Sequence, residues 1–498
     1  MPGLHKIMHF AKAAPAVGLS LVTAILAIDL DLNNEDSIRD AAKTITHSII
    51  TRYHKGSGIP GLFGQPYYFW ESGLAWDSLI NYQYLTGDTS YNDLIFEALM
   101  SQVGPERDFM PPNQTKSEGN DDQAYWALAA MTAAEWGFPE PRNRDNSSNV
   151  TWVQLAQNVF NEQAARWDNG TCNGGLRWQI FAFNNGYTYK NSMSNGAFFQ
   201  LANRLRLYTG NETYTDWASS ALNWALGVGL IANISDTENA GSVYDGTSAV
   251  DGNCTQINHI QWTATIAQYL AGTAYWWNAT RSLYGQNYIQ FFARANETFA
   301  SLPNAVSNGT LTEVACAQND NCNTDQLAFR AVLARAMAQV RDLTVDTRLY
   351  KSRNETIDGQ TVPIANRSEP LWTIHERINF ILGTSALGAA AQCSGGKDGT
   401  TCGNSWGNST FDGSQGLGQD LSALNIILAN LPAGRPANSS MTKAAPAPAS
   451  NGTTTAGGLG NGSSGGAPAQ ATASGASGIS ASSFALLAGI AFAIAFCV

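Results

Sequence analysis

Apolar and polar residues follow a helical rather than an alternating pattern along most of this chain. Six segments of 12 to 16 residues carry apolar side chains at helical spacing, are rich in Ala and Leu, and are separated by Gly and Asn. Such spacing predicts helices with buried faces. The segments are residues 73–85, 123–136, 196–208, 259–272, 326–340 and 378–392. Because we find no comparable series of alternating strands, the sequence predicts an all-α class.

A short turn motif follows some of these segments. The stretches "LTGDTSY" (85–91) and "YTGNETY" (208–214) each come after an apolar helix. Glycine adopts the left-handed conformation that ends a helix, and the Asp or Asn after it can cap the next one. A third stretch, "LAGTAY" (270–275), resembles a degenerate copy. Repeated helical hairpins favour a solenoid or a closed double ring of helices.

The first 27 residues have the layout of a secretory signal peptide. A basic start is followed by an apolar stretch from Ala13 and by small residues near Ala27, where a peptidase can cut. The alternative is a membrane anchor, but Pro15 and Gly18 interrupt an apolar run that is already short for a span. We therefore expect residues 1–27 to be removed.

The other end of the chain is predicted to hold a stalk and a lipid-attachment signal. From about Asn438 the composition changes to Ser, Thr, Gly, Ala and Pro, which cannot bury enough apolar surface to fold. We expect a stalk over 433–475 and a glycosylphosphatidylinositol (GPI) attachment signal over 476–498, ending in "SSFALLAGIAFAIAFCV". A transmembrane helix is the alternative, but this tail is shorter than the roughly 20 residues that a bilayer needs. The folded domain is then 29–432.

Cysteines and glycosylation sequons fit the same secretory route. Of seven cysteines, Cys497 lies in the expected tail, and the remaining six suit three disulfides. Proximity in sequence suggests two pairs and leaves a third, although six cysteines allow about fifteen connectivities: Cys316/Cys322, Cys393/Cys402 and Cys172/Cys254. About sixteen Asn-x-Ser/Thr sequons are spread over the chain, including Asn113, Asn149, Asn211, Asn278, Asn354 and Asn408.

Charge and motifs exclude several classes of function. The net charge is -11, and the sequence lacks the Lys and Arg clusters that phosphate neutralisation requires, so nucleic acid is not an expected partner. No P-loop, dinucleotide fingerprint or zinc cluster is found, so neither a cofactor nor a metal site is expected. The stretch "GNSWG" (403–407) fits G-x-S-x-G, but it lies in a Gly-rich loop and lacks the strand and helix of a serine hydrolase.

Two neighbouring carboxylates, Asp121 and Asp122, precede the apolar segment 123–136. One interpretation is a polar helix start, since acidic residues in a first turn complement the helix dipole. The other is catalysis, because that helix is apolar at nearly every position and an ionised carboxylate is costly to bury unpaired. Retaining glycosidases place two carboxyl groups about 5 to 5.5 Å apart, a spacing near that of adjacent Cβ atoms. Two like charges this close also drive their pKa values apart.

The segment "EGNDDQAYWALAAMTAAE" resembles the signature of glycoside hydrolase family 76, the endo-α-1,6-mannanases. Further similarity runs through "WDNGTCNGGLRWQ", "YKNSMSNGAFFQLANRLRLYTGN", "VYDG" and "QWTATIAQYLAG". The resemblance implies an (α/α)6 barrel over most of 29–432. With both terminal signals, it is strongest to the fungal GPI-anchored cell-wall branch, which implies action on the mannose core of GPI anchors and transfer of glycoproteins to wall glucan.

On that resemblance Asp121 is the nucleophile and Asp122 the general acid/base. Four further residues are candidate substrate contacts where loops meet inner helices, with caps, turns and core packing as the alternative for each: Asp77, Trp126, Asn195 and Asp245. Trp76, Trp178 and Trp262 are expected to be core rather than sugar platforms.

The expected function is therefore a retaining α-mannosidase or transglycosidase with an α-mannose glycan as donor and a β-glucan as acceptor. It is expected at the outer face of the plasma membrane and in the cell wall, held by GPI lipid alone. The alternatives are a non-catalytic mannan-binding wall protein and a secreted hydrolytic mannanase. Groove shape and water exclusion decide between hydrolysis and transfer, and the sequence leaves that choice open.

Overall fold

A computed structural model gives the fold of the chain. It describes residues 27–144, 149–232, 241–281, 289, 309–317, 319–344, 354–357, 360–363, 365–396 and 399–433, all of which belong to one structural unit. The expected signal peptide lies outside these residues except for its last position. Apart from Ala433, the expected stalk and the expected attachment signal also lie outside them.

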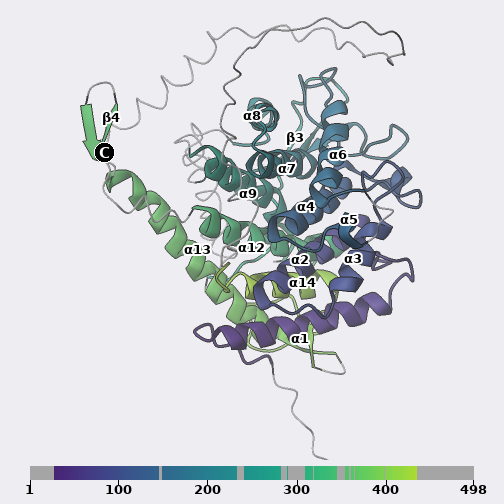
Figure 1. The fold of residues 1–498 in the computed structure, drawn as a ribbon, viewed down its shortest axis with the longest axis vertical. Helices are drawn as coiled ribbons and strands as arrows, with labels where there is room; N and C mark the ends of the chain where they lie inside the picture. The colour runs from purple at the N-terminus through teal and green to yellow at the C-terminus, as the bar shows by residue number, and fades with distance from the viewer. Residues whose placement is uncertain are drawn as a thin grey trace, which may run out of the picture. The chain divides into compact units, whose positions relative to one another are not determined.

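Helices make up most of the described residues (Figure 1). They are α1 (Glu35–His54), α2 (Phe69–Thr86), α3 (Asn92–Ser101), η1 (Thr115–Ser117), α4 (Asn120–Trp136), α5 (Pro141–Arg144), α6 (Trp152–Ala165), α7 (Ser192–Thr209), α8 (Thr213–Gly227), α9 (Thr263–Thr280), α11 (Val314–Ala317), α12 (Thr324–Thr344), α13 (Ala365–Gln392) and α14 (Leu417–Leu428). Within the described ranges, none of these helices is both long and apolar enough to cross a membrane.

Short antiparallel strands join some of the helices. They are β1 (Tyr189–Asn191), β2 (Gly246–Ser248) and β3 (Ile257–Asn258) in one sheet, β4 (Asn354–Ile357) with β5 (Gln360–Pro363), and β6 (Cys393–Gly395) with β7 (Thr401–Cys402). In the first sheet Asn191 pairs with Gly246, and Gly246 with Asn258. This sheet brings the chain that enters α7 next to the chain that enters α9.

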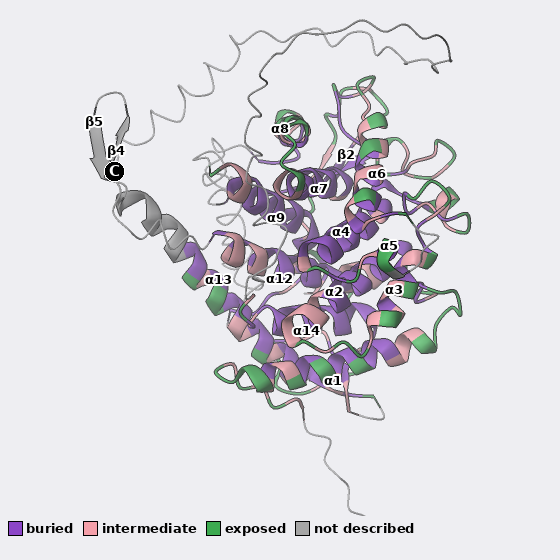
Figure 2. Cartoon of the chain, in the orientation of Figure 1, coloured by how far each residue is buried: buried purple, intermediate pink, exposed green. Residues whose placement is uncertain are grey.

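Six helices of the described chain form a closed inner ring. Each packs on the next in the order α2, α4, α7, α9, α12 and α14, and α14 packs back on α2. Helices α1, α3, α6, α8 and α13 pack on the outside of this ring. Figure 2 shows the difference in burial: α4, α7 and α9 are purple along most of their length, whereas α1 alternates between buried and exposed. The predicted all-α class and (α/α)6 barrel are confirmed.

The turn motif ends two helices as predicted and fails at the third position. Gly87 and Gly210 are left-handed C-caps of α2 and α7, with φ of 75° and 77°. Gly272 instead lies inside α9. A Cβ there would lie 2.5 Å from the ring of Phe199, so this glycine permits close packing of α9 on α7 and ends no helix.

The six cysteines of the folded domain form the three pairs suggested by their spacing: Cys172–Cys254, Cys316–Cys322 and Cys393–Cys402. The first ties the segment before β1 to the segment between β2 and β3. The third joins β6 to β7.

Candidate active site

The two aspartates occupy the first turn of α4. Gly119 is extended before the helix and donates its N–H to Asp122 Oδ2 at 2.8 Å. Asn120 donates its backbone N–H to the Trp178 carbonyl at 2.8 Å and its side-chain amide to the Arg177 carbonyl at 2.8 Å. The start of α4 is therefore held against the segment around residue 178, which fixes the direction of both carboxyl groups.

Asp121 is almost enclosed, with 8% of its surface exposed. Its Oδ2 accepts a 2.8 Å hydrogen bond from the side chain of Asn191, and its Oδ1 accepts one from the backbone N–H of Asp122 at 3.0 Å. Asn191 is itself fixed, because its other side-chain atom caps α7 by accepting from Ser194 N–H at 3.1 Å. The carboxyl of Asp121 is thus held by two donors from different elements.

Asp122 is half-buried and lies between the first turns of two helices. Besides Gly119, the backbone N–H of Trp70 in the first turn of α2 donates to its Oδ1 at 3.2 Å. The indole N–H of Trp70 donates to Asp325 Oδ1 at 2.7 Å. Asp325 in the first turn of α12 therefore places a third carboxyl group near the pair.

The pKa values of the two carboxyls are both raised and unequal. Burial raises the pKa of Asp121 to about 6, against the opposing hydrogen bond from Asn191. Burial and the charge of Asp121 raise the pKa of Asp122 to about 8. Near neutral pH the arrangement favours an ionised Asp121 beside a protonated Asp122, which are the states of a nucleophile and a general acid.

Other buried acids surround the pair without adding much charge. Burial raises the pKa of Glu71 to about 8 and that of Glu118 to about 10. Both carboxyls are then neutral near pH 7, and Glu118 has no hydrogen-bond partner for either oxygen. Nowhere in the described residues do three or more His, Cys, Asp or Glu side chains form a group suited to a metal ion.

Asp77 and Trp126, two of the predicted substrate contacts, lie inside helices rather than where loops meet them. Asp77 is in the middle of α2, 6% exposed, and pairs with Arg335 at 3.3 Å. Trp126 is completely buried and stacks on Phe69 with ring centroids 4.8 Å apart. Its indole N–H also donates to the Phe69 carbonyl. The structure therefore shows Trp126 packed in the core and Asp77 in a buried ion pair.

Asn195 and Asp245 lie close to the site but are occupied by the protein itself. Asn195 is fully buried and bonds Leu176 N–H, the Leu176 carbonyl and the Asn191 carbonyl. Asp245 accepts hydrogen bonds from three side chains, those of Tyr189 (2.6 Å), Asn258 (3.1 Å) and Trp262 (2.8 Å). Both residues hold neighbours of Asp121 and Asp122 in place, and their side-chain hydrogen-bonding groups are engaged by the protein.

Sequence reasoning missed Asn191, Trp70 and Trp178. The available signal for Asn191 was its position before the apolar segment of α7, which marks an N-cap. Trp178 was expected in the core, yet 38% of it is exposed. A Cβ on Gly119 would lie 2.5 Å from Asp121 Oδ1 and 3.2 Å from the Trp178 ring. The Trp178 ring and the Asp121 carboxyl therefore both lie next to Gly119.

Comparison with known proteins gives consistent matches along the chain. A family model described as glycosyl hydrolase family 76 matches residues 37–361 and 364–443. The mannan endo-1,6-alpha-mannosidase DCW1 of Saccharomyces cerevisiae is 40% identical over 404 residues, covering 81% of this chain and 81% of that protein. The mannan endo-1,6-alpha-mannosidase DFG5 of the same yeast is 36% identical over 424 residues, covering 84% and 83%.

Two solved structures share the fold. Dfg5 from Chaetomium thermophilum in complex with glucosamine aligns with a TM-score of 0.67 and 34% identity, covering 80% of this chain and 92% of that one. An inactive α-1,6-mannanase variant from Salegentibacter sp., with two consecutive aspartates changed to asparagine and α-1,6-mannotriose bound, aligns with a TM-score of 0.58. At 16% identity, over 80% and 100% of the two chains, the latter shows the fold alone.

Proposed function

Since the chain belongs to glycosyl hydrolase family 76 and is a glycoside hydrolase, we propose that it cleaves α-1,6-linked mannosides with retention, using Asp121 and Asp122. One arrangement carries the assignment of roles. The carboxyl of Asp121 accepts a hydrogen bond from the Asn191 side chain, which favours its ionised form, while burial and the neighbouring charge of Asp121 raise the pKa of Asp122 and favour its protonated form. The relatives at 36 to 40% identity are named mannan endo-1,6-alpha-mannosidases.

The proposed reaction has two steps. A carboxylate oxygen of Asp121 bonds to the anomeric carbon as the glycosidic bond breaks, and Asp122 gives its proton to the departing oxygen. Asp122, now ionised, then takes a proton from a water or sugar hydroxyl that displaces Asp121 from that carbon. The donors from Asn191, Gly119 and Trp70 hold both carboxyls in place and cost no rearrangement during the reaction.

The pH dependence of kcat/KM follows from these two groups. As pH falls through about 6, Asp121 takes up a proton and ceases to be a nucleophile. As pH rises through about 8, Asp122 loses the proton that the leaving group needs. We expect a bell-shaped profile with its maximum between these values, measured on α-1,6-mannotetraose. A rate that stays constant across both limbs would contradict the assignment.

Trp178 is expected to bind a mannose ring beside the nucleophile. Its side chain is 38% exposed and lies next to Gly119, which precedes the two aspartates. We take the range of about 0.5 to 1.5 kcal/mol known for contacts between aromatic rings as the contribution of a contact with a sugar ring. We expect Trp178→Ala to raise KM for α-1,6-mannotetraose about three- to tenfold. The matched control is Phe380→Ala, which truncates an aromatic of α13 that is 61% exposed. An equal change in both variants would count against a platform role.

For the biological role, we propose transfer of GPI-linked glycoproteins from the mannose core of the anchor to wall β-glucan. The terminal segments of the sequence support a secreted, GPI-anchored enzyme at the plasma membrane and wall. The complex of the Chaetomium relative with glucosamine supports a donor in which mannose is joined to an amino sugar, as it is in GPI anchors.

Product analysis tests this proposal. Purified protein is incubated with an α-1,6-mannose-containing GPI core glycan, with and without a β-glucan oligosaccharide, and the products are followed by mass spectrometry. A mannose-to-glucan adduct that Asp121→Asn does not form would support transfer. Free glycan alone would show a hydrolase, such as a secreted mannanase. No turnover would favour a mannan-binding wall protein.

A further inference from the structure

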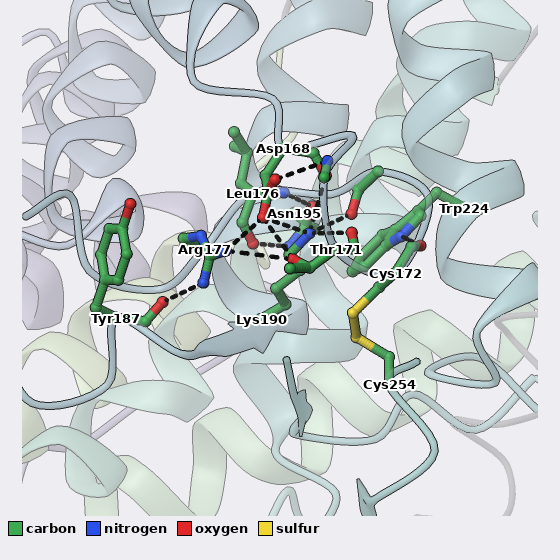
Figure 3. Close-up of polar contacts among 12 residues, drawn as sticks. Asp168, Thr171, Cys172, Leu176, Arg177, Tyr187, Lys190, Asn195, Trp224 and Cys254 are labelled. Carbon is green, nitrogen blue, oxygen red and sulfur yellow. Dashed lines mark hydrogen bonds and ion pairs between the residues drawn. A yellow bond between two sulfur atoms is a disulfide. The ribbon is translucent and has the colours of Figure 1, made fainter. Parts of the chain in front are cut away.

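Lys190 is a completely buried lysine one residue before Asn191, the residue that holds Asp121. Figure 3 shows its side chain pointing into the loop that precedes β1. The ammonium donates to the carbonyls of Asp168 (3.1 Å), Thr171 (2.8 Å) and Gly174 (2.6 Å), and it lies 3.2 Å from Asp168 Oδ2. Four oxygens therefore surround one ammonium, as carbonyl and carboxylate oxygens surround a bound cation.

The loop that supplies these oxygens, residues 167–178, has an unfavourable backbone conformation. Cys172, Asn173, Gly174 and Gly175 have φ of 57°, 55°, 136° and 89°. Four consecutive positive values, two of them at residues with side chains, cost free energy that surrounding contacts must offset. The convergence of three carbonyls on Lys190 supplies such contacts. Without a cation at this point, the same carbonyl dipoles would face one another unpaired.

The far end of the loop reaches the catalytic helix. Leu176 is held through its N–H and carbonyl by Asn195, which also donates to the Asn191 carbonyl. The next two carbonyls, of Arg177 and Trp178, accept hydrogen bonds from Asn120, the residue before Asp121. Figure 3 shows Lys190, Asn195 and Arg177 gathered at the same stretch of loop.

We propose that Lys190 is an internal cation that positions the nucleophile. It acts on Asp121 by two routes: along β1 to Asn191, and through the loop 167–178 to Asn120 at the start of α4. Lys190 does not touch substrate in this proposal. The loop adopts its conformation because the ammonium of Lys190 occupies its centre and pairs its carbonyls.

A purely structural role makes a different prediction. The disulfide Cys172–Cys254 and the Asp168–Arg177 ion pair at 2.7 Å also hold the loop. If these suffice, loss of the ammonium changes stability and leaves kcat intact. If the proposal holds, removal of Lys190 lowers kcat, and a free cation that enters the vacated space restores it. The test rests on the proposed α-mannosidase activity for its kinetic part only.

The experiment compares Lys190→Ala, Lys190→Met and a control, Lys43→Ala, which removes an exposed lysine of α1. For folded Lys190→Ala we expect kcat on α-1,6-mannotetraose to fall about 100-fold, the usual cost of a small misplacement of reacting groups. We expect KM to change less than about threefold. Ammonium chloride or potassium chloride at about 0.1 M should raise the kcat of Lys190→Ala about tenfold. Lys190→Met fills the space with an apolar side chain and should not respond.

Three results would overturn the proposal: a kcat within about threefold of wild type in Lys190→Ala, a loss that neither cation relieves, or equal recovery in Lys190→Met. Should Lys190→Ala fail to fold, Asp168→Asn takes its place, because it removes the carboxylate that faces the Lys190 ammonium. We expect its kcat to be about tenfold lower than that of the wild type. An unchanged kcat in Asp168→Asn would refute the proposal.

Hydrogen–deuterium exchange separates this proposal from the proposed function. In Lys190→Ala, amide exchange should rise both in 167–178 and in 119–125, and ammonium should reverse it, with no substrate present. A wild-type protein inactive on mannotetraose would refute the activity while leaving this readout valid. Exchange that rises in the loop and not in 119–125 would refute the positioning role.

Discussion

Replacing Asp121 by asparagine is expected to lower kcat on α-1,6-mannotetraose by about 10⁴-fold or more, the loss seen when a nucleophile is removed from a coupled set. Asparagine has nearly the same shape, and its one carbonyl oxygen can still accept one of the two hydrogen bonds, from Asn191 or from the Asp122 N–H. The fold and the binding of substrate should therefore persist. What is lost is the anionic oxygen that bonds to the anomeric carbon.

A matched control is Asp216→Asn, which makes the same change at an exposed aspartate in the first turn of α8. That variant should keep wild-type kinetics. Azide then separates the two catalytic roles. With Asp121→Ala it should give mannosyl azide of inverted configuration, and with Asp122→Ala the retained anomer, because only the latter still forms the glycosyl-enzyme. The opposite assignment of anomers would exchange the roles of the two aspartates.

The second large effect concerns stability and an ion pair in the centre of the barrel. Arg204 of α7 and Glu135 of α4 are 1% and 2% exposed. The guanidinium donates to both carboxylate oxygens of Glu135, at 2.9 and 2.8 Å, and to the Leu128 carbonyl and the Thr132 hydroxyl. We expect Arg204→Met to lower the free energy of unfolding by about 3 to 5 kcal/mol, because Glu135 is left charged and buried without its partner.

Urea denaturation of three variants checks this expectation. Arg204→Met combined with Glu135→Gln removes both charges and keeps an acceptor for the hydroxyl of Tyr275, which donates to Glu135. The double variant should recover most of the lost stability. Arg206→Met, two residues along the same helix, breaks a pair with the exposed Glu212 and should cost at most about 1 kcal/mol. Similar losses in Arg204→Met and Arg206→Met would show that burial of the first pair is unimportant.

Part of this protein could be predicted from local sequence. Five of the six apolar segments lie wholly on helices, and the sixth, 259–272, lies on α9 from Thr263 onward, because helical spacing of apolar residues needs no knowledge of the partner surface. Gly87 and Gly210 end helices because left-handed backbone is a local preference of glycine. The proximity of Asp121 and Asp122 could also be predicted, since residues adjacent in sequence are close together in any fold. Their catalytic roles came from family resemblance and stay a prediction until tested.

The tertiary structure decided what each of these residues contacts. Asn191 reaches Asp121 across 70 positions of sequence, and Trp70 reaches Asp122 across 52, so no local pattern predicts either donor. Asp77, Trp126, Asn195 and Asp245 looked available in sequence, but partners 17 or more positions away engage each of them. Gly272 matched the turn motif in sequence, but in the structure it lies inside α9 beside the ring of Phe199.

The sequence by itself determined which segments are helical, because that depends on neighbours three and four positions away. The closure of the ring decided burial, hydrogen-bond partners and pKa values, because these depend on atoms that are close in space and far apart along the chain.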